Sequence, residues 1–260
     1  MPPVIALLTD FGHVDPYVGQ MKGTILQHAP GAVIVDLCHE ILPHNAGQAG
    51  FLLQASRHHF PRNAIFVCVV DPEVGFQRNL LLARQAEQLF LAPDNGLLSF
   101  LGDLETSWWT IEPGPATPCH TFHGRDILAP AAGNLAMGAD PASLGRPMAR
   151  PGVRRSPIFW AIPEDDTFPC RVLHVDRFGN CLLNLRSADF SMTGHPWRLE
   201  NGTLVKEART YADLAPEEYG LLAGSQGVME LALNQDSCAR RLGLAPGDAL
   251  HLISTRPGRP

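Results

Sequence analysis

Two short apolar runs that each lead into an aspartate constrain the fold of this chain more than any other feature. Val4 to Leu8 and Ile65 to Val70 contain no polar residue, so neither run shows the alternation of a half-exposed strand. Runs of this kind are typical of strands buried on both faces, as in a parallel sheet covered by helices. Asp10 and Asp71, which follow the two runs, would then lie at the carboxyl edge of the sheet, where open α/β sheets bind ligands.

Segments with helical spacing separate the predicted strands. Tyr17 to His28 repeats apolar residues on one face and ends before Pro30-Gly31. Val33 to Leu37 is predicted to be a further strand, and Asn45 to His59 a second helix. Strands and helices that alternate in this way predict a layered α/β domain with a largely parallel sheet.

The pattern changes after about residue 150. Turn-forming and charged residues fill 150–157, which is typical of a linker. Helical periodicity then fades, and short strands at regular spacing favour a small barrel or sandwich. We therefore expect an α/β domain over residues 1–155 and a smaller all-β domain over residues 156–260. The strands predicted in the second domain are Arg171 to Val175, Cys181 to Leu185, Val228 to Leu233 (with Met229, Leu231 and Leu233 on one side) and Ala249 to Ile253.

Composition excludes several classes of protein. The 260 residues include 20 Lys and Arg against 26 Asp and Glu, and neither half of the chain has the basic surplus that nucleic-acid binding requires. The longest apolar run, Ala64 to Val70, has seven residues, whereas a membrane-spanning helix needs about 20. Met1-Pro2-Pro3-Val4 leads straight into a strand, so we expect no targeting segment. The six cysteines form no CxxC pair, which favours the reducing cytoplasm, and no metal-ligand spacing occurs.

Three polar residues could form a catalytic group. Asp71 and Arg78 stand at opposite ends of a glycine-containing loop, which can fold back so that the guanidinium meets the carboxylate. His123 lies in a dense polar segment, 121–126. An Asp–Arg–His trio without a Ser, Cys or metal fits a site that holds and polarises a water molecule. The structural alternative stays open, because an aspartate before Phe-Gly or Pro commonly forms a turn or a helix cap.

Seven motifs follow one another from residue 9 to residue 234. They are Thr9-Asp10-Phe11-Gly12, the segment 17–23, the segment 69–78, Pro93-Asp94-Asn95-Gly96, the segment 121–126, Asp176-x-Phe178-Gly179-Asn180 and the segment 224–234. In this order they resemble the S-adenosyl-L-methionine (SAM) hydroxide adenosyltransferases, the adenosine-forming SAM hydrolases related to fluorinases and chlorinases. The resemblance implies an α/β N-terminal domain, an all-β C-terminal barrel and a homotrimer with sites between the N-domain of one subunit and the C-domain of the next.

The resemblance also implies an activity and a set of site residues. SAM would be hydrolysed to adenosine and L-methionine by in-line attack of water or hydroxide on the ribose C5′, with SAM as substrate and neither a metal nor a cofactor. Asp71, Arg78 and His123 match the water-activating trio, Asp10 the carboxylate that holds the ribose hydroxyls, and Asp176 a carboxylate beside the methionine ammonium. The other positions matched to substrate binding are Phe11, Asn95, Phe178, Asn180, Ser225, Glu230 and, through its backbone, Leu233.

This chain departs from the family pattern at Glu73 and Phe76, where relatives carry Gly and Thr or Ser. A glycine at position 73 would suit a positive φ, which other residues adopt with difficulty. Glu73 either points to solvent or raises the proton affinity of the trio through like-charge repulsion. Gln226 is a milder departure, where the halogenating relatives carry arginine.

Two other functions stay open. A halide could replace water as the nucleophile, although the carboxylate of Asp71 would repel an anion. The chain could also bind SAM or adenosine without turnover, with Glu73 and Phe76 as marks of a decayed site.

Overall fold

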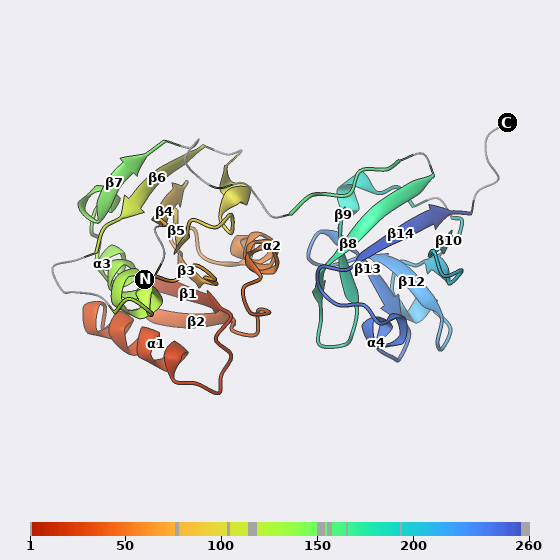
Figure 1. Cartoon of the computed structure of the whole chain (residues 1–260), viewed down its shortest axis with the longest axis horizontal. Coiled ribbons are helices and arrows are strands. Elements are labelled where there is room, and N and C mark those ends of the chain that lie inside the picture. Colours follow the sequence, from red (N-terminus) through yellow and green to blue (C-terminus); the bar gives the residue numbers. More distant parts are fainter. Residues whose placement is uncertain are drawn as a thin grey trace. The chain divides into compact units, whose positions relative to one another are not determined.

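The chain divides into two compact units, Met1–Pro157 and Ile158–Pro260, each with its own hydrophobic core (Figure 1). The computed structural model describes residues 2–75, 78–102, 105–113, 119–149, 154, 158–164, 166–192 and 194–255. Apart from Arg154, the predicted linker at 150–157 lies outside these ranges. Within them, no helix is long and apolar enough to cross a membrane.

A sheet with the strand order β2-β1-β3-β5-β4-β6-β7 forms the middle of the first unit. Neighbours from β2 to β5 pair in parallel, and those from β5 to β7 pair antiparallel. The predicted parallel strands are thus confirmed, and an antiparallel extension is added to them. The strands are β1 (Val4–Thr9), β2 (Val33–Cys38), β3 (Ile65–Val69), β4 (Leu80–Gln85), β5 (Gln88–Pro93), β6 (Thr106–Ile111) and β7 (Gly145–Met148).

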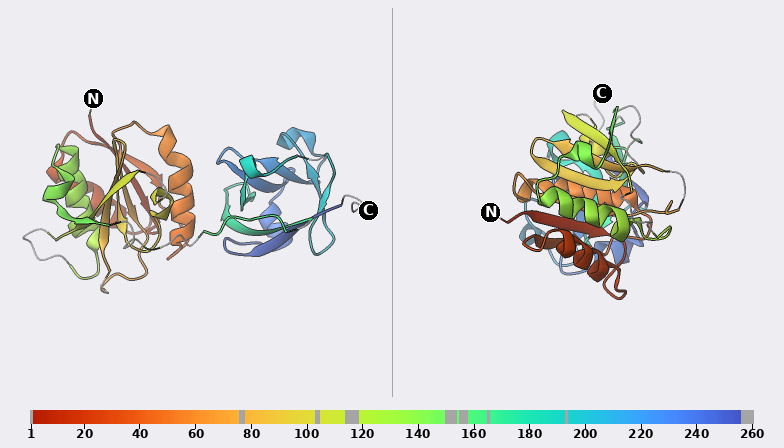
Figure 2. Two further views of the ribbon diagram at one scale, coloured as in Figure 1. Left: turned by 90° about the horizontal axis from the view of Figure 1, so that it is seen from above. Right: turned by 90° about the vertical axis from the view of Figure 1, so that its left-hand side faces the viewer.

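Helices cover both faces of this sheet (Figure 2). Along β1, Ile5 and Leu7 face a core that includes residues of α1 (Tyr17–His28) and α3 (Ala129–Ala136). Ala6 and Leu8 face a second core that includes residues of α2 (Ala46–Ser56). Because successive residues of a strand point to opposite faces, a run buried on both sides must be apolar at every position. The runs Val4 to Leu8 and Ile65 to Val70 are therefore apolar at every position, as the sequence indicated.

The second predicted helix is shorter than expected. Its N-cap is Asn45, whose side chain accepts a hydrogen bond from the backbone N–H of Gln48 at 2.9 Å. After Ser56 the chain tightens into the 3₁₀ turn Arg57–His59. Other short helical turns are the 3₁₀ turns Ser99–Leu101 and Pro141–Ser143 and the π-helical turn Gly124–Leu128, which runs directly into α3.

The second unit is a closed barrel with the strand order β10-β11-β12-β13-β9-β8-β14, which confirms the all-β barrel. Met229, Leu231 and Leu233 of β13 share the barrel core, as predicted. The opposite side of β13 is buried as well, because the 208–214 segment covers it and Ala232 packs with Leu214. The elements are β8 (Thr167–Val175), β9 (Cys181–Arg186), β10 (Trp197–Arg198), β11 (Leu204–Glu207), β12 (Tyr219–Ala223), β13 (Val228–Leu233), β14 (Ala249–Ser254), the helix α4 (Cys238–Leu242) and the 3₁₀ turns Ser187–Asp189 and Tyr211–Asp213.

Candidate active site

Three elements bring Asp71, Arg78 and His123 together. Asp71 follows β3, Arg78 precedes β4, and His123 is the N-cap of the π-helical turn before α3. The Nε of Arg78 donates to both carboxylate oxygens of Asp71 at 2.8 Å, and its Nη2 also donates to Oδ2. The same Nη2 lies 3.1 Å from Nδ1 of His123. The loop therefore folds back as the sequence predicted, and the arginine joins the other two residues.

Two members of this trio form a buried ion pair, and the third is a histidine whose pKa is shifted by its surroundings. Only 3% of the Asp71 side chain and 2% of the Arg78 side chain are exposed, so each neutralises the other away from bulk water. Burial, followed by the charge of Arg78, lowers the pKa of His123 below its ordinary value. A neutral His123 accepts the hydrogen bond from Arg78 at Nδ1, which leaves its proton on Nε2.

The conformation of the loop after Asp71 shows whether Glu73 occupies a position that requires a positive φ. Among the described residues of this loop, positive φ occurs at Gly75, at 88°, and not at Glu73. The backbone N–H of Glu73 donates to Oδ1 of Asp71 at 3.1 Å, and its carboxylate pairs with Arg154 at 2.8 Å. Glu73 therefore stands opposite a positive charge, while Phe76 lies outside the described residues.

Asp10 lies just after β1, in a turn next to a network of hydrogen bonds that includes the buried side chains of Thr9 and His39. Its Oδ2 accepts from the backbone N–H of His44 at 2.9 Å. The preceding residue, Thr9, is fully buried, and its hydroxyl lies 2.8 Å from Nδ1 of His39. The Nε2 of His39 pairs with Oδ1 of Asp36 at 3.0 Å, which places the ring proton on Nε2, so that Nδ1 accepts from the Thr9 hydroxyl.

Phe11 connects this turn to the segment that carries His123. Its ring packs edge-on against Phe122, with 5.6 Å between the centroids, and against Tyr17 at 5.7 Å. Edge-to-face pairs of this kind add packing energy beyond the area they bury. The aromatic contact therefore ties the turn of Asp10 to the residue next to His123.

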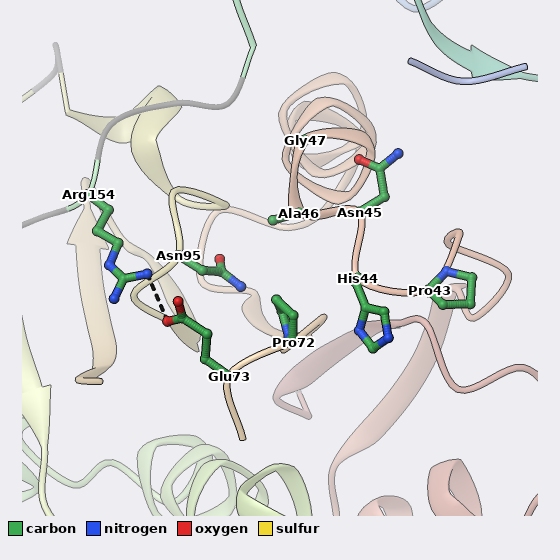
Figure 3. A pocket seen from close by; sticks show the side chains of 9 residues that line it. All are labelled: Pro43, His44, Asn45, Ala46, Gly47, Pro72, Glu73, Asn95 and Arg154. Atoms are coloured by element: carbon green, nitrogen blue, oxygen red, sulfur yellow. Dashed lines mark hydrogen bonds and ion pairs between the residues drawn. The ribbon is translucent and has the colours of Figure 1, made fainter. Parts of the chain in front are cut away.

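A pocket of about 460 Å³ opens beside these loops in the first unit (Figure 3). Asn95 is one of its lining residues, and the amide of Asn95 donates to the carbonyl of Val70 at 2.7 Å. The pocket is bounded by loops that follow β2, β3 and β5, three strands of the parallel part of the sheet, as expected for the carboxyl edge of an open sheet. It is lined by Pro43, His44, Asn45, Ala46, Gly47, Pro72, Glu73, Asn95 and Arg154.

Three predicted site residues of the second unit share one tight turn between β8 and β9. Oδ1 of Asp176 accepts from the backbone N–H groups of Phe178 at 2.9 Å and Asn180 at 2.8 Å, and its Oδ2 accepts from Nδ2 of Asn180 at 2.9 Å. Gly179 adopts a φ of 88°, and a Cβ there would collide with Ser237. Phe178 is 78% exposed in this turn.

The remaining predicted residues lie on or beside β13. Glu230 is 5% exposed, Leu233 is buried at the end of the strand, and Ser225 lies exposed in the turn between β12 and β13. The hydroxyl of Tyr211 donates to Oε2 of Glu230 at 2.7 Å and lies 3.5 Å from Nδ2 of Asn180. Tyr211 and His44 were missed by the sequence reasoning, since neither stands in a motif that singles it out.

Two family models match this chain in sequence. The SAM hydroxide adenosyltransferase N-terminal domain matches residues 5–145, and the C-terminal domain of the same family matches residues 170–251. The chain belongs to the SAM hydroxide adenosyltransferase family. The predicted trio and Asp10 fall within the matched N-terminal domain, and the sites on β13 and its neighbouring turns fall within the matched C-terminal domain.

Relatives in the SAM hydroxide adenosyltransferase family cover nearly the whole chain. The (R)-S-adenosyl-L-methionine hydrolase of Thermus thermophilus is 35% identical over 97% of this chain and 100% of its own length. The enzyme of the same name from Salinispora arenicola is 34% identical over 97% of this chain and 98% of its own. A fluorinase from an Actinoplanes species is 25% identical over 80% of each chain.

Solved structures give the same result for the fold. An uncharacterised conserved protein from Thermotoga maritima superposes with a TM-score of 0.89 at 28% identity, over 96% of this chain and 99% of that one. A conserved hypothetical protein from Thermus thermophilus gives a TM-score of 0.79 at 31% identity, over 97% and 100%.

Proposed function

We propose that this chain hydrolyses SAM to adenosine and L-methionine. The observation that carries the proposal is the buried Asp71–Arg78–His123 trio at the carboxyl edge of the sheet. Relatives named (R)-S-adenosyl-L-methionine hydrolase, at 32–35% identity, support SAM as the substrate.

The chemistry suits a site without an acid for the leaving group. Water or hydroxide attacks the ribose C5′ in line with the carbon–sulfur bond, and the sulfonium leaves as the neutral thioether of methionine. The proposal needs no metal ion or cofactor, because the leaving group already carries the positive charge that drives its departure. Since hydroxide and sulfonium lose charge as they react, a site with little water favours the transition state over the reactants.

Each member of the trio has a role that its contacts support. Arg78 holds Asp71 with two nitrogens and favours hydroxide over water by its charge. Asp71 accepts the proton of the attacking water. His123, with its proton on Nε2, donates a hydrogen bond to the attacking oxygen and keeps it in place.

Binding residues orient the substrate for this attack. Asp10, whose carboxylate is held by the backbone of His44, takes the ribose hydroxyls, and Phe11 and Asn95 flank the same edge of the sheet. In the second unit Asp176 takes the methionine ammonium. Phe178, Asn180, Ser225, Glu230 and the backbone of Leu233 complete the contacts to the two ends of SAM. Orientation of this kind can contribute several kcal/mol to the lowering of the barrier, on the order of 7 in favourable cases.

Fluorinase-type chemistry is the second candidate, because fluorinases of 23–26% identity are also relatives. The position of Asp71 argues against it, since a buried carboxylate beside the nucleophile repels a halide. A fluoride- or chloride-dependent 5′-halo-adenosine product would reverse this preference.

The experiment is to incubate purified protein with SAM and to separate the products by chromatography. Adenosine and methionine in equal amounts support the proposal. Folded protein that yields no adenosine at any pH or salt concentration contradicts it, and tight calorimetric binding of SAM without turnover would identify a binding module instead.

We also propose that the chain acts as a homotrimer in the cytoplasm. The family resemblance supports the trimer, and the free cysteines support a reducing compartment. Light scattering coupled to size-exclusion chromatography tests the assembly, with three times the mass of one chain as the expected result.

A further inference from the structure

The chain between β2 and α2 contains a tight turn whose third residue has a left-handed backbone conformation. The backbone N–H of Asn45 donates to the carbonyl of Leu42 at 3.0 Å, which closes a four-residue β-turn over 42–45. Pro43 occupies the second position of this turn, and His44, with a φ of 69°, occupies the third (Figure 3). A proline followed by a residue of positive φ is the pattern of a type II turn, in which glycine or asparagine is usual at the third position.

Hydrogen bonds to the first turn of α2 hold both ends of this β-turn. Oε1 of the buried Gln48 accepts from the backbone N–H of Leu42 at 2.8 Å. The side chain of Asn45 accepts from the backbone N–H of Gln48 at 2.9 Å and so caps the helix. The two ends are therefore fixed, and the orientation of the Pro43–His44 peptide between them depends on the φ of His44.

The conformation of His44 decides which group of this peptide faces Asp10. Type I and type II turns have the same φ at the second residue but differ by about 150° in its ψ, which turns the central peptide over. In the observed turn, the backbone N–H of His44 donates to Oδ2 of Asp10 at 2.9 Å. In a type I turn this N–H would point away from Asp10 and the carbonyl oxygen of Pro43 would take its place, where the carboxylate repels it.

We propose that His44 is a positioning residue that acts through its left-handed backbone, because the type II turn aims its N–H at Asp10 and holds the carboxylate in the orientation that takes the ribose hydroxyls. This inference rests on the proposed function, in which Asp10 binds the ribose. A left-handed backbone costs free energy for a residue other than glycine, and such residues cluster at binding and active sites. His44 is exposed, so burial of its side chain does not explain the strained backbone.

The experiment measures the dissociation constant of adenosine by calorimetry, with the whole chain, for three substitutions that all remove the imidazole of His44. Glycine and asparagine adopt positive φ readily, whereas a β-branched residue does so only as an outlier. His44→Gly and His44→Asn should therefore bind adenosine about tenfold more tightly than His44→Val, the effect of one hydrogen bond to a charged group. A contact made by the side chain would instead make His44→Gly the weakest binder.

A second ligand shows whether the effect acts on the ribose. 2′,3′-Dideoxyadenosine lacks both hydroxyls that Asp10 is proposed to bind, so it should not distinguish His44→Gly from His44→Val. A general loss of stability in His44→Val would weaken the binding of both ligands alike. With SAM as substrate, KM should be higher in His44→Val than in His44→Gly and kcat should differ less, because His44 touches no reacting atom.

Ala86 provides a matched control for backbone strain. It has a φ of 51° in the turn between β4 and β5. This turn lies at the amino edge of the sheet, because Leu89, near the start of β5, pairs in parallel with Ile65, the first residue of β3. Ala86→Val therefore places a β-branched residue in the same backbone region at the edge opposite Asp10, and it should bind adenosine as the wild-type protein does.

The outcomes separate this inference from the proposed function. Equal adenosine affinity and equal KM in folded His44→Gly and His44→Val, or His44→Gly as the weaker binder, overturns the inference even if SAM is hydrolysed. Equal weakening of adenosine and 2′,3′-dideoxyadenosine by His44→Val overturns it as well. The predicted order of affinities without hydrolysis of SAM supports the inference and contradicts the proposed function. If the wild-type protein neither binds adenosine nor hydrolyses SAM, both are overturned.

Discussion

Arg78 donates from Nε to both carboxylate oxygens of Asp71 at 2.8 Å, and its Nη2 reaches His123 at 3.1 Å. One guanidinium therefore orients two side chains that come from separate parts of the chain. This follows from its planar fork of donors, which a lysine cannot reproduce.

Replacing the guanidinium of Arg78 by an ammonium tests whether activity requires the planar set of donors that contacts both Asp71 and His123. Arg78→Lys keeps the positive charge but cannot hold Asp71 and His123 together, so kcat/KM for SAM should fall about 100-fold, the usual effect of losing one preorganised donor. Arg84→Lys on β4, whose side chain is exposed, is the control and should keep wild-type activity. Wild-type kcat/KM in Arg78→Lys would contradict the assigned role.

The pH dependence follows from the lowered pKa of His123. Because the folded pKa lies below the ordinary 6.5, the unfolded chain binds this proton more tightly than the folded protein. The contribution of neutral His123 to stability is thus fully present above pH 6.5 and is lost as the pH falls below it. Protonation also removes the Nδ1 acceptor of Arg78, so kcat/KM should fall on the acid side with an apparent pKa below 6.5.

His123→Asn is the matched variant for this prediction. The asparagine oxygen can accept from Arg78 in place of Nδ1, but the side chain does not titrate. The acid limb of the pH profile should lose the inflection due to His123, while some activity remains. An acid limb with the same midpoint in both proteins would show that another group is responsible.

The loop residue Glu73 is expected to have little influence on the trio. Its ion pair with Arg154 is 38% and 48% exposed, and pairs of this kind contribute at most about 1 kcal/mol. Glu73→Gln should therefore change the free energy of unfolding by less than about 1 kcal/mol and leave the pH profile of kcat/KM in place. If the profile moves to lower pH, like-charge repulsion from Glu73 does act on the trio.

The hydrogen bonds that join Thr9, His39 and Asp36, next to Asp10, are expected to contribute both to the stability of the fold and to the binding of SAM. Thr9→Val has nearly the same shape but leaves Nδ1 of the buried His39 without its donor, which should cost about 1–3 kcal/mol in urea denaturation. Because Asp10 is the next residue, KM for SAM should rise more than kcat falls. Thr24→Val, at a half-buried position of α1 where the hydroxyl donates only to the backbone carbonyl of Gln20, is the control.

The buried parallel strands could be predicted because a few consecutive residues are enough to specify each of them. An uninterrupted apolar run has few alternatives to a strand covered on both faces, and Asp71 follows such a run. The hairpin of β4 and β5 was not predicted, since Ala86 adopts a φ of 51° in its turn without the Asn-Gly or Asp-Gly signal of tight hairpins.

The site was predictable only where sequence spacing limits geometry. Arg78 follows Asp71 by seven positions, and a glycine lies between them, so the loop can fold back and bring the two side chains together. The structure shows this contact. The contact of Tyr211 with Glu230 joins a loop to a strand 19 positions away, and no local pattern specifies it. The roles of the remaining substrate-binding residues stay predictions.

Hydrolysis of SAM in oxygen-18 water tests the central claim most directly. If the trio activates water for attack on the ribose C5′, mass spectrometry will find one heavy oxygen in the adenosine at its 5′-hydroxyl and none in the methionine, and Asp71→Asn will form this product far more slowly. Adenosine without the heavy oxygen, or undiminished turnover by Asp71→Asn, would contradict the account.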